Sequence, residues 1–396
     1  LEQNITIRKN RVTAESTQID VKTAKAALFP SLSFSTSQQV VNRPYQETSS
    51  RVSGSEIISS NSKTSYNGNY GLNASWTIYN GSKRLKTLKQ ERLNNQVAEL
   101  DVATSENMIK ESIAQIYIQI LYAAESVRVN ENTLQVSIAQ RDRGQELLNA
   151  GSIAKSDFAQ LEAQVSTDRY QLVTAQATLQ DYKLQLKQLL ELDGENEMNV
   201  YLPKLSDENV LAPLPAKKDV YVSALAIRPE IEASKLNVEA SELGIDIAKS
   251  SYFPTISLSA GIGTNHTSGS DFTFGEQVKN GWNNSIGLSV SVPIFNNRQT
   301  KSAVQKAKLQ RETDMLSLLD EQKALYKTIE SLWLDANSAQ QRYAAANEKL
   351  RSTQISYDLI SEQFNLGMKN TVELLTEKNN LLQAQQEQLQ AKYMAI

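Results

Sequence analysis

The sequence has no cysteine and only one histidine, His266, among its 396 residues. The chain therefore forms no disulfide and no thiolate metal site, and one histidine cannot build a histidine metal cluster. His266 stands in a segment rich in Ser, Asn and Gly, which predicts an ordinary loop residue. We find no Ser/His/Asp set and no glycine-rich phosphate loop, so we expect neither an enzyme nor a bound cofactor or metal.

The chain also has no large excess of positive or negative charge. The chain has 41 Lys and Arg against 44 Asp and Glu, for a formal net charge of −3, and its basic residues form no block. This balance argues against a nucleic-acid partner. No run of about 18 apolar residues occurs, so the sequence predicts no transmembrane helix. The chain opens at Leu1 inside a helical pattern without Met, which we interpret as a start whose targeting segment is missing.

What the sequence does contain is one structural unit written twice. Phe29-Pro30 and Phe253-Pro254 each end a helix-like segment and precede strand-like alternation. Each copy continues with a polar loop, a second alternating segment and a very long helical segment. The intervals Tyr79–Gly151 and Phe295–Gly367 are both 72 positions. Equal spacing over that length indicates an internal duplication.

The duplication predicts two repeats joined by an irregular linker, which contains Pro203, Pro213 and Pro215. The expected boundaries are a first repeat 1–192 (helix, β-hairpin 31–79, long helix 82–147, helix 153–192), a linker 193–219 around the waist of the molecule, and a second repeat 220–396 (helix, β-hairpin 255–295, long helix 298–364, helix 370–396).

The strand-like segments alternate in a way that favours a membrane over water. In 66–79 the even positions are mostly apolar or aromatic and the odd positions are small and polar. The second copy places Leu288 and Val290 on one face, Ser289 and Ser291 on the other. A soluble sandwich, the alternative, usually carries Lys and Glu on its exposed face. A polar face of Ser, Asn, Thr and Gly instead suits the water-filled lumen of a transmembrane β-barrel.

Four strands cannot close such a barrel, because known barrels need at least about 8. Open sheet edges are excluded in lipid, so the chain must oligomerise, and three copies would give twelve strands. We expect the long polar loops, about 44–64 and 264–283, on the outer side. An interfacial aromatic girdle is expected at the opposite side, formed by Phe29, Tyr79, Phe253 and Phe295.

The long helical segments lack proline and would each extend about 100 Å at ~1.5 Å per residue. Their apolar positions recur at steps of three and four, which is the spacing of a coiled-coil seam. The same spacing continues after each glycine turn, at Leu161, Val165, Leu172 and Ala175 in one copy and at Leu375, Leu382, Leu389 and Ile396 in the other. A long hollow bundle and a solvated stalk both fit this pattern.

Taken together, these segments resemble the TolC-like outer-membrane efflux protein family over essentially the whole chain. The most specific pieces are 226–231 (AIRPEI), Tyr252-Phe253-Pro254 and the duplicated strand-then-helix pattern. The resemblance implies a mixed α and β homotrimer. Its twelve-stranded transmembrane β-barrel in the outer membrane is continued by a coiled-coil-like α-helical barrel in the periplasm.

In function, the resemblance implies the passive outer-membrane channel of a tripartite efflux or type I secretion system. The implied partners are outer-membrane lipid, a periplasmic adaptor (membrane fusion) protein and an inner-membrane transporter of the RND, ABC or MFS type. The alternative is a trimeric structural or adhesive coiled-coil surface protein anchored by a small barrel.

The resemblance also points to residues at the two helix turns. Glycine is expected there on backbone grounds, since tight helix ends favour a positive φ. Turn chemistry alone is one interpretation; in the family the same segments also meet the adaptor. The corresponding positions are Gly151, Ser152, Ser156, Gly367, Met368 and Thr371.

In the family, polar links between the two hairpins close a constriction. The matching positions are Asp157 and Lys369, while Phe364 stands where the family has an aromatic hydroxyl and cannot supply one. An Asp157–Lys369 pair would then carry the closure; the alternative is that each residue is a solvated charge on its own helix. Glu373 and Thr376 match two positions that are acidic in some members, so we expect one carboxylate ring, of Glu373, rather than two.

Overall fold

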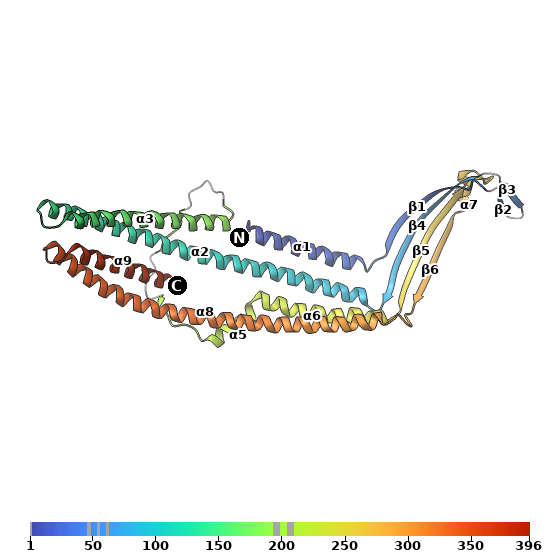
Figure 1. Cartoon of the computed structure of the whole chain (residues 1–396). Coiled ribbons are helices and arrows are strands. Elements are labelled where there is room, and N and C mark those ends of the chain that lie inside the picture. The colour runs from blue at the N-terminus through green and yellow to red at the C-terminus, as the bar shows by residue number, and fades with distance from the viewer. Residues whose placement is uncertain (1, 46–48, 54–55, 61–62, 193–198, 204–209) are drawn as a thin grey trace. The chain divides into compact units, whose positions relative to one another are not determined.

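A computed structural model describes residues 2–45, 49–53, 56–60, 63–192, 199–203 and 210–396 (Figure 1). The chain is mostly helical with a small antiparallel sheet. It divides into two compact units. One comprises Leu1–Val12, Glu99–Glu232 and Leu319–Ile396, and the other comprises Thr13–Ala98 and Ala233–Leu318. Among the described residues, none of the helices combines the length and apolar character needed to cross a membrane.

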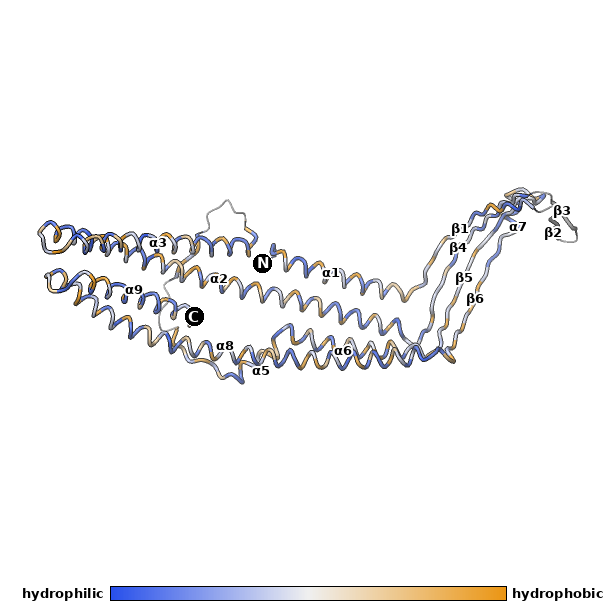
Figure 2. Tube along the Cα trace, in the orientation of Figure 1, coloured by the Kyte–Doolittle hydropathy of each residue, from blue (hydrophilic) through white to orange (hydrophobic). Residues whose placement is uncertain are grey.

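Two helices of 67 residues dominate the chain, one in each repeat. Hydrophobic and hydrophilic residues alternate along both at short intervals, as coiled-coil packing requires (Figure 2). Pro229 is the first residue of α6, a position where its missing N–H would have no partner within the helix. The helices are α1 Ile5–Ala26, α2 Lys83–Asn149, α3 Lys155–Leu189, α5 Lys217–Ile227, α6 Pro229–Lys249, α8 Gln299–Asn365 and α9 Thr371–Met394.

The sheet contains four strands in the order β1-β4-β5-β6, with every neighbouring pair antiparallel. Its central pair, β4 with β5, joins the first repeat to the second. The strand β6 ends before Pro293, which has no N–H to donate to a ladder. The bounds are β1 Ser31–Asn42, β4 Thr64–Asn80, β5 Thr255–Thr267 and β6 Asn283–Ser291.

The strand register sorts side chains into apolar and polar rows across the whole sheet. Because successive residues of a strand point to opposite faces, neighbouring rows lie on opposite sides. One row is apolar and contains Leu32, Ala74, Ala260 and Ile286, and the next is small and polar and contains Ser33, Asn73, Gly261 and Ser285. The apolar side chains at the sheet edges are open, with Phe34 67% and Ile286 79% exposed.

Both predicted loops contain regular structure, which corrects the sequence interpretation. The first holds a separate strand pair, β2 Ser49–Ser53 and β3 Glu56–Ser60. The second holds α7 Phe274–Asn280, whose N-terminus is capped by Thr273 and Glu276. His266 lies in β5 rather than in a loop. Its ring stacks on Tyr70 at 5.9 Å and meets Phe274 edge-on at 5.1 Å.

Two residues in the left-handed region directly precede each long helix. Gly81 and Ser82 have φ of 66° and 63°, and Asn297 and Arg298 have φ of 50° and 64°. At the first junction the Ser250 hydroxyl donates to the Gly81 carbonyl at 2.9 Å. The two long helices therefore begin after the same backbone conformation, although the second follows its strand after a longer connection.

Candidate functional site

The candidate site is formed by the turns of the hairpins α2–α3 and α8–α9. At the first turn the Ser152 N–H donates to the Leu147 carbonyl at 2.8 Å and the Gly151 N–H to the Leu148 carbonyl at 3.0 Å. At the second, Met368 and Gly367 bond in the same pattern to residues 363 and 364. Both turns are Schellman motifs, with Gly151 and Gly367 at φ of 72° and 75°.

The space around the two turn glycines is open within the described chain. A Cβ built on Gly151 or Gly367 would meet no atom within 4 Å. Within the chain, glycine is therefore required at these two positions by the positive φ alone and not by the crowding of neighbouring atoms. Ser152, Ser156 and Met368 are also exposed, so the tips offer accessible surface.

Thr371 differs from the other predicted docking residues, because it is only 2% exposed within the chain. It is the first residue of α9 and lies one turn before the fully buried Leu374. Its docking role stays a prediction.

The structure gives Asp157 and Lys369 separate partners and, among the described ion pairs, does not join them to each other. The Asp157 carboxylate accepts the Ala154 N–H at 3.3 Å, at the start of α3. The Lys369 ammonium lies 2.5 Å from Glu373 Oε1, one helical turn further along. Within this single chain Lys369 therefore pairs locally with Glu373, and the Asp157–Lys369 link stays a prediction.

Glu373 has a capping role in addition to its charge. Its backbone N–H donates to the Asn370 side chain at 2.9 Å, while its carboxylate accepts the Asn370 N–H at 3.2 Å. The hydrogen bond from Lys369 holds the pKa of Glu373 below its ordinary value, and the Asn370 N–H lowers it further. Glu373 is therefore ionised at neutral pH. Thr376 is exposed and donates to the carbonyl of Val372 on its own helix at 2.8 Å.

Phe364 is buried and contributes packing, in keeping with its lack of a hydroxyl group. A hydroxyl contact between the hairpins exists one heptad earlier, where the Gln140 side chain of α2 donates to the Tyr357 hydroxyl of α8 at 2.9 Å. Burial raises the pKa of this tyrosine. The sequence analysis did not predict this contact, because Gln140 and Tyr357 lie outside the family positions that were compared around the helix turns.

A buried ionic cluster was also missed. Lys378 of α9 donates to the Asp168 carboxylate of α3 and to the Ser137 hydroxyl of α2, and Ser137 also donates to Asp168. The second carboxylate oxygen of Asp168 accepts from Gln164 at 2.9 Å. The Lys378 and Asp168 side chains are 3% and 1% exposed. The sequence pattern could have predicted the burial of Asp168, because this residue occupies the coiled-coil seam position between Val165 and Leu172.

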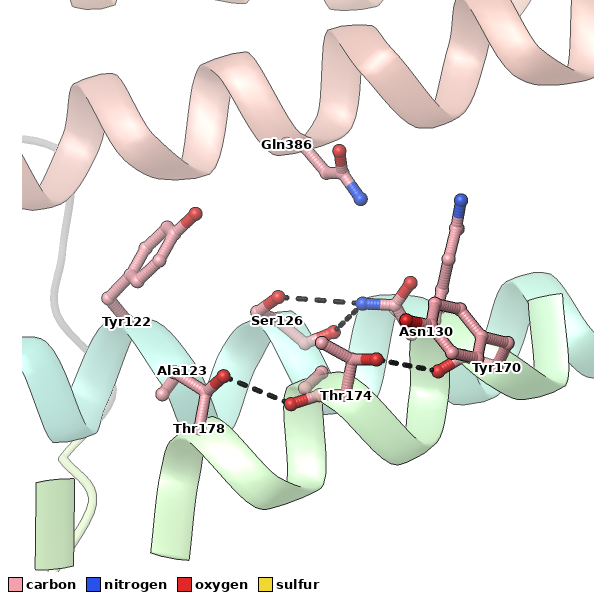
Figure 3. A pocket seen from close by; sticks show the side chains of 10 residues that line it. Tyr122, Ala123, Ser126, Asn130, Tyr170, Thr174, Thr178 and Gln386 are labelled. Atoms are coloured by element: carbon pink, nitrogen blue, oxygen red, sulfur yellow. Dashed lines mark hydrogen bonds between the residues drawn. The ribbon is translucent and has the colours of Figure 1, made fainter. Parts of the chain in front are cut away.

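A groove near α2, α3 and the side chain of Gln386 is lined by both polar and apolar residues, several of which bond to their own helices (Figure 3). The Asn130 amide donates to the Ser126 carbonyl at 2.8 Å, and Thr174 donates to the Tyr170 carbonyl at 2.9 Å. These two donors are used by their own helices, whereas the buried side-chain oxygen of Gln171 in the same groove has no hydrogen-bond partner within the described chain. Within the described part of the chain, no three His, Asp or Glu residues are grouped to bind a metal ion.

A strand pair, a 67-residue helix and a glycine-turned hairpin, present twice, define the class of outer-membrane efflux channel proteins. The profile of the family described as "Outer membrane efflux protein" matches residues 1–191 and 220–395. The chain therefore belongs to the outer membrane efflux protein family, and the TolC-like resemblance is confirmed. This is a family of outer-membrane channel proteins rather than enzymes.

Among curated relatives, the chain is 25% identical over 293 residues to the outer membrane efflux protein BepC of Brucella suis, a match that covers 74% of this chain and 61% of BepC. It is 24% identical over 336 residues to the outer membrane protein TolC of Escherichia coli K12, covering 81% of this chain and 66% of TolC. The matches thus span less than two thirds of the length of these two relatives.

Solved structures share the fold of the whole chain. A crystal structure of CusC superposes with a TM-score of 0.83 at 19% identity and covers 100% of this chain and 87% of CusC. The outer membrane protein VceC of Vibrio cholerae superposes with a TM-score of 0.81 at 16% identity, covering 100% of this chain and 91% of VceC.

Proposed function

We propose that three copies of this chain form a passive duct through the outer membrane, as the exit channel of a tripartite efflux or type I secretion system. The observation that carries the proposal is the four-stranded sheet. One of its faces is apolar and open, and the other is small, polar and nearly free of charge. Lipid suits the first face and a water-filled lumen the second.

The sheet edges support closure by further copies. Within the described residues, β1 and β6 each have a partner strand on one side only. Because every neighbouring pair is antiparallel, β1 and β6 run in opposite directions, and the β6 edge of one copy can continue antiparallel onto the β1 edge of the next. Three copies give twelve strands, enough for a barrel without open edges.

The helical hairpins are proposed to project into the periplasm, with their tips facing a periplasmic adaptor protein and, through it, an inner-membrane transporter of the RND, ABC or MFS type. The exposed surface around Gly151, Ser152, Ser156, Gly367 and Met368 supports a docking role for the tips. The backbone already explains the glycines, so docking is an additional use of the same turns.

Reconstitution into planar bilayers tests the proposed duct. Purified protein is expected to produce stepwise conductance of uniform size, since a closed ring has one lumen. A barrel-anchored surface fibre, the alternative, would bind the bilayer without conducting. If protein that is shown to be inserted into the bilayer gives no unitary conductance steps, the proposed duct is wrong.

Glu373 is proposed to line the constriction as a threefold ring that attracts cations. In such channels, Glu373→Gln is expected to raise the divalent-cation concentration for half block roughly three- to tenfold, because three carboxylates leave the ring and the Lys369 ammonium groups that they paired with remain. The lowered pKa of Glu373 means that block persists in mild acid and weakens only as the pH falls through that pKa. Half-block concentrations from current recordings at several pH values measure both effects.

Glu146→Gln is the matched control, since Glu146 carries the same charge near the other tip and pairs with Arg143. It should leave the half-block concentration unchanged. If divalent cations block the wild type and the Glu373 variant equally, the proposed Glu373 ring is wrong.

A further inference from the structure

The helix α7 lies against one face of the sheet, at the C-terminal end of β5. Its Phe274 ring meets the His266 ring edge-on at 5.1 Å, and the Thr264 hydroxyl donates to its Val278 carbonyl at 2.7 Å. Thr264 and His266 share a face with Ile262, because the side chains of a strand alternate. That face is the apolar one, so α7 covers the face proposed to meet lipid and not the face proposed to line the lumen.

Room for this packing comes from a glycine in the neighbouring strand. Gly68 lies opposite His266 in the register, and a Cβ there would overlap Cε1 of the histidine ring. The ring stacks on Tyr70, while its buried Nδ1 has no hydrogen-bond partner within the described residues. Gln277 of α7 also accepts the Thr267 N–H at 2.8 Å. Ring packing and hydrogen bonds from β5 therefore fix α7 on the sheet.

Large aromatic side chains around α7 remain open. Phe272 is 49% exposed, and Phe274 and Trp282 are each 57% exposed. Trp282 directly precedes β6, where alternation places it with Asn284 and Ile286 on the apolar face. Exposing such rings to water is unfavourable, whereas aromatic side chains concentrate where a membrane meets water. The ring positions therefore favour a membrane boundary at α7.

The position of α7 along the sheet agrees with such a boundary. Phe253, in the aromatic girdle expected at the other side, and His266 are 13 positions apart. A strand of that length rises about 43 Å at ~3.3 Å per residue, or about 30 Å along the membrane normal at a tilt of ~45°. The hydrocarbon core of a bilayer has the same thickness, ~30 Å. The last row with aliphatic side chains on both β4 and β5 is that of Leu72 and Ile262, so α7 begins where the hydrocarbon is expected to end.

Charges limit how deep α7 can lie. The Glu276 carboxylate accepts the Thr273 N–H at 2.8 Å, and this hydrogen bond holds the pKa of Glu276 below its ordinary value. Glu276 is therefore ionised at neutral pH, and Lys279 is exposed as well. Ionised side chains are costly in hydrocarbon and are accommodated at the membrane surface. The helix is consequently suited to the headgroup layer, with the aromatic rings at the boundary of the acyl chains.

We propose that α7, together with the flanking residues Phe272 and Trp282, is an interfacial anchor that lies in the outer leaflet of the membrane beside the sheet. The His266 ring fastens the anchor to β5. The inference rests on the proposed membrane-spanning sheet and gives its second loop segment a lipid surface as partner. A lid over the mouth of the duct is the alternative, and it would need α7 on the polar face.

Bromine on phospholipid acyl chains quenches tryptophan on contact and so reports its depth. The full chain is inserted into phosphatidylcholine vesicles whose bromines lie near the headgroup end or near the methyl end of the acyl chains. Because the chain has three tryptophans, the emission of the Trp282→Phe protein is subtracted from that of wild type to isolate Trp282. In the same way, Phe274→Trp/Trp282→Phe against Trp282→Phe gives the signal from position 274 on α7.

Both signals are expected to lose most of their intensity with bromines near the headgroup end and little with bromines near the methyl end. A lid in water would leave both signals unchanged by bromine at either depth and open to quenching by acrylamide in the solution. That result overturns the anchor.

His266→Ala and Asn265→Ala form a matched pair, because the two residues are neighbours on β5 and point to opposite faces. His266→Ala removes the ring that packs against Phe274, so quenching of the signal from position 274 by shallow bromines should weaken. Asn265→Ala should leave that quenching unchanged. Equal quenching in the two variants would contradict the fastening by His266, and if His266→Ala does not fold, the depth measured without it decides.

Insertion is checked in every sample by resistance to added protease. A chain that does not insert would overturn both the anchor and the duct. Inserted protein with both signals quenched by shallow bromines, but without conductance steps, would count against the duct alone.

Discussion

Leu288→Arg is expected to prevent insertion of the sheet into lipid, whereas Ser289→Arg, one residue further along β6, is expected to be tolerated. Leu288 is 65% exposed and lies opposite Leu258 in the register, on the apolar face. Ser289 lies opposite Ser257, on the polar face. Arginine on the lipid side of a barrel costs about 2–4 kcal/mol near the bilayer centre, and the penalty recurs in every copy.

The measurement is the fraction of protein that becomes protease-resistant and vesicle-bound after folding into phosphatidylcholine vesicles. The two substitutions add the same side chain at neighbouring positions, so each controls for the other. If Ser289→Arg blocked insertion and Leu288→Arg did not, the assignment of the faces would be inverted.

A second large effect is expected from cysteines placed on the two edge strands. With Ser289→Cys on β6 combined in turn with cysteine at Ser31, Ser33, Ser35 or Ser37 of β1, at least one pair should convert the protein into a covalent trimer. All these positions lie on the polar face, so side chains of adjoining edges point the same way. A disulfide forms only when the Cα atoms lie within about 7 Å, so the scan also reports the register between copies.

The readout is a non-reducing denaturing gel of detergent-solubilised protein after mild oxidation. Phe34→Cys with Ser289→Cys, which places the two thiols on opposite faces, is the control and should stay uncrosslinked. A ladder that ends at the dimer, or a band larger than the trimer, would contradict three copies.

The sequence predicts the sheet and the long helices well because their signals are repeated many times. Strand alternation recurs in four segments, and each long helix lacks proline and keeps its three-four spacing. On α9 the predicted seam was wrong by one residue near the tip, because Leu374 and Leu375 are adjacent. The structure buries Leu374 fully, and Lys378 follows it in the seam.

Charged residues explain most of what the sequence analysis missed at the site. A charge is ordinarily assigned to solvent, so Asp168 and Lys378 were not considered for the core even though their spacing fits it. The Lys369–Glu373 pair could have been predicted from its i,i+4 spacing alone. For α7, the segment from Thr273 to Glu276 has the capping-box pattern, a helix signal inside a segment interpreted as a loop.

Pairing of β4 with β5 inside one chain has a consequence for how a ring of such subunits comes together. A closed ring needs a strand pairing at every boundary between a first and a second repeat. Half of these pairings are β4–β5 pairs within one chain, which form independently of protein concentration. Only the remaining half depend on collisions between subunits in the membrane. Duplication within a single polypeptide thus halves the number of sheet junctions that must form between separate subunits.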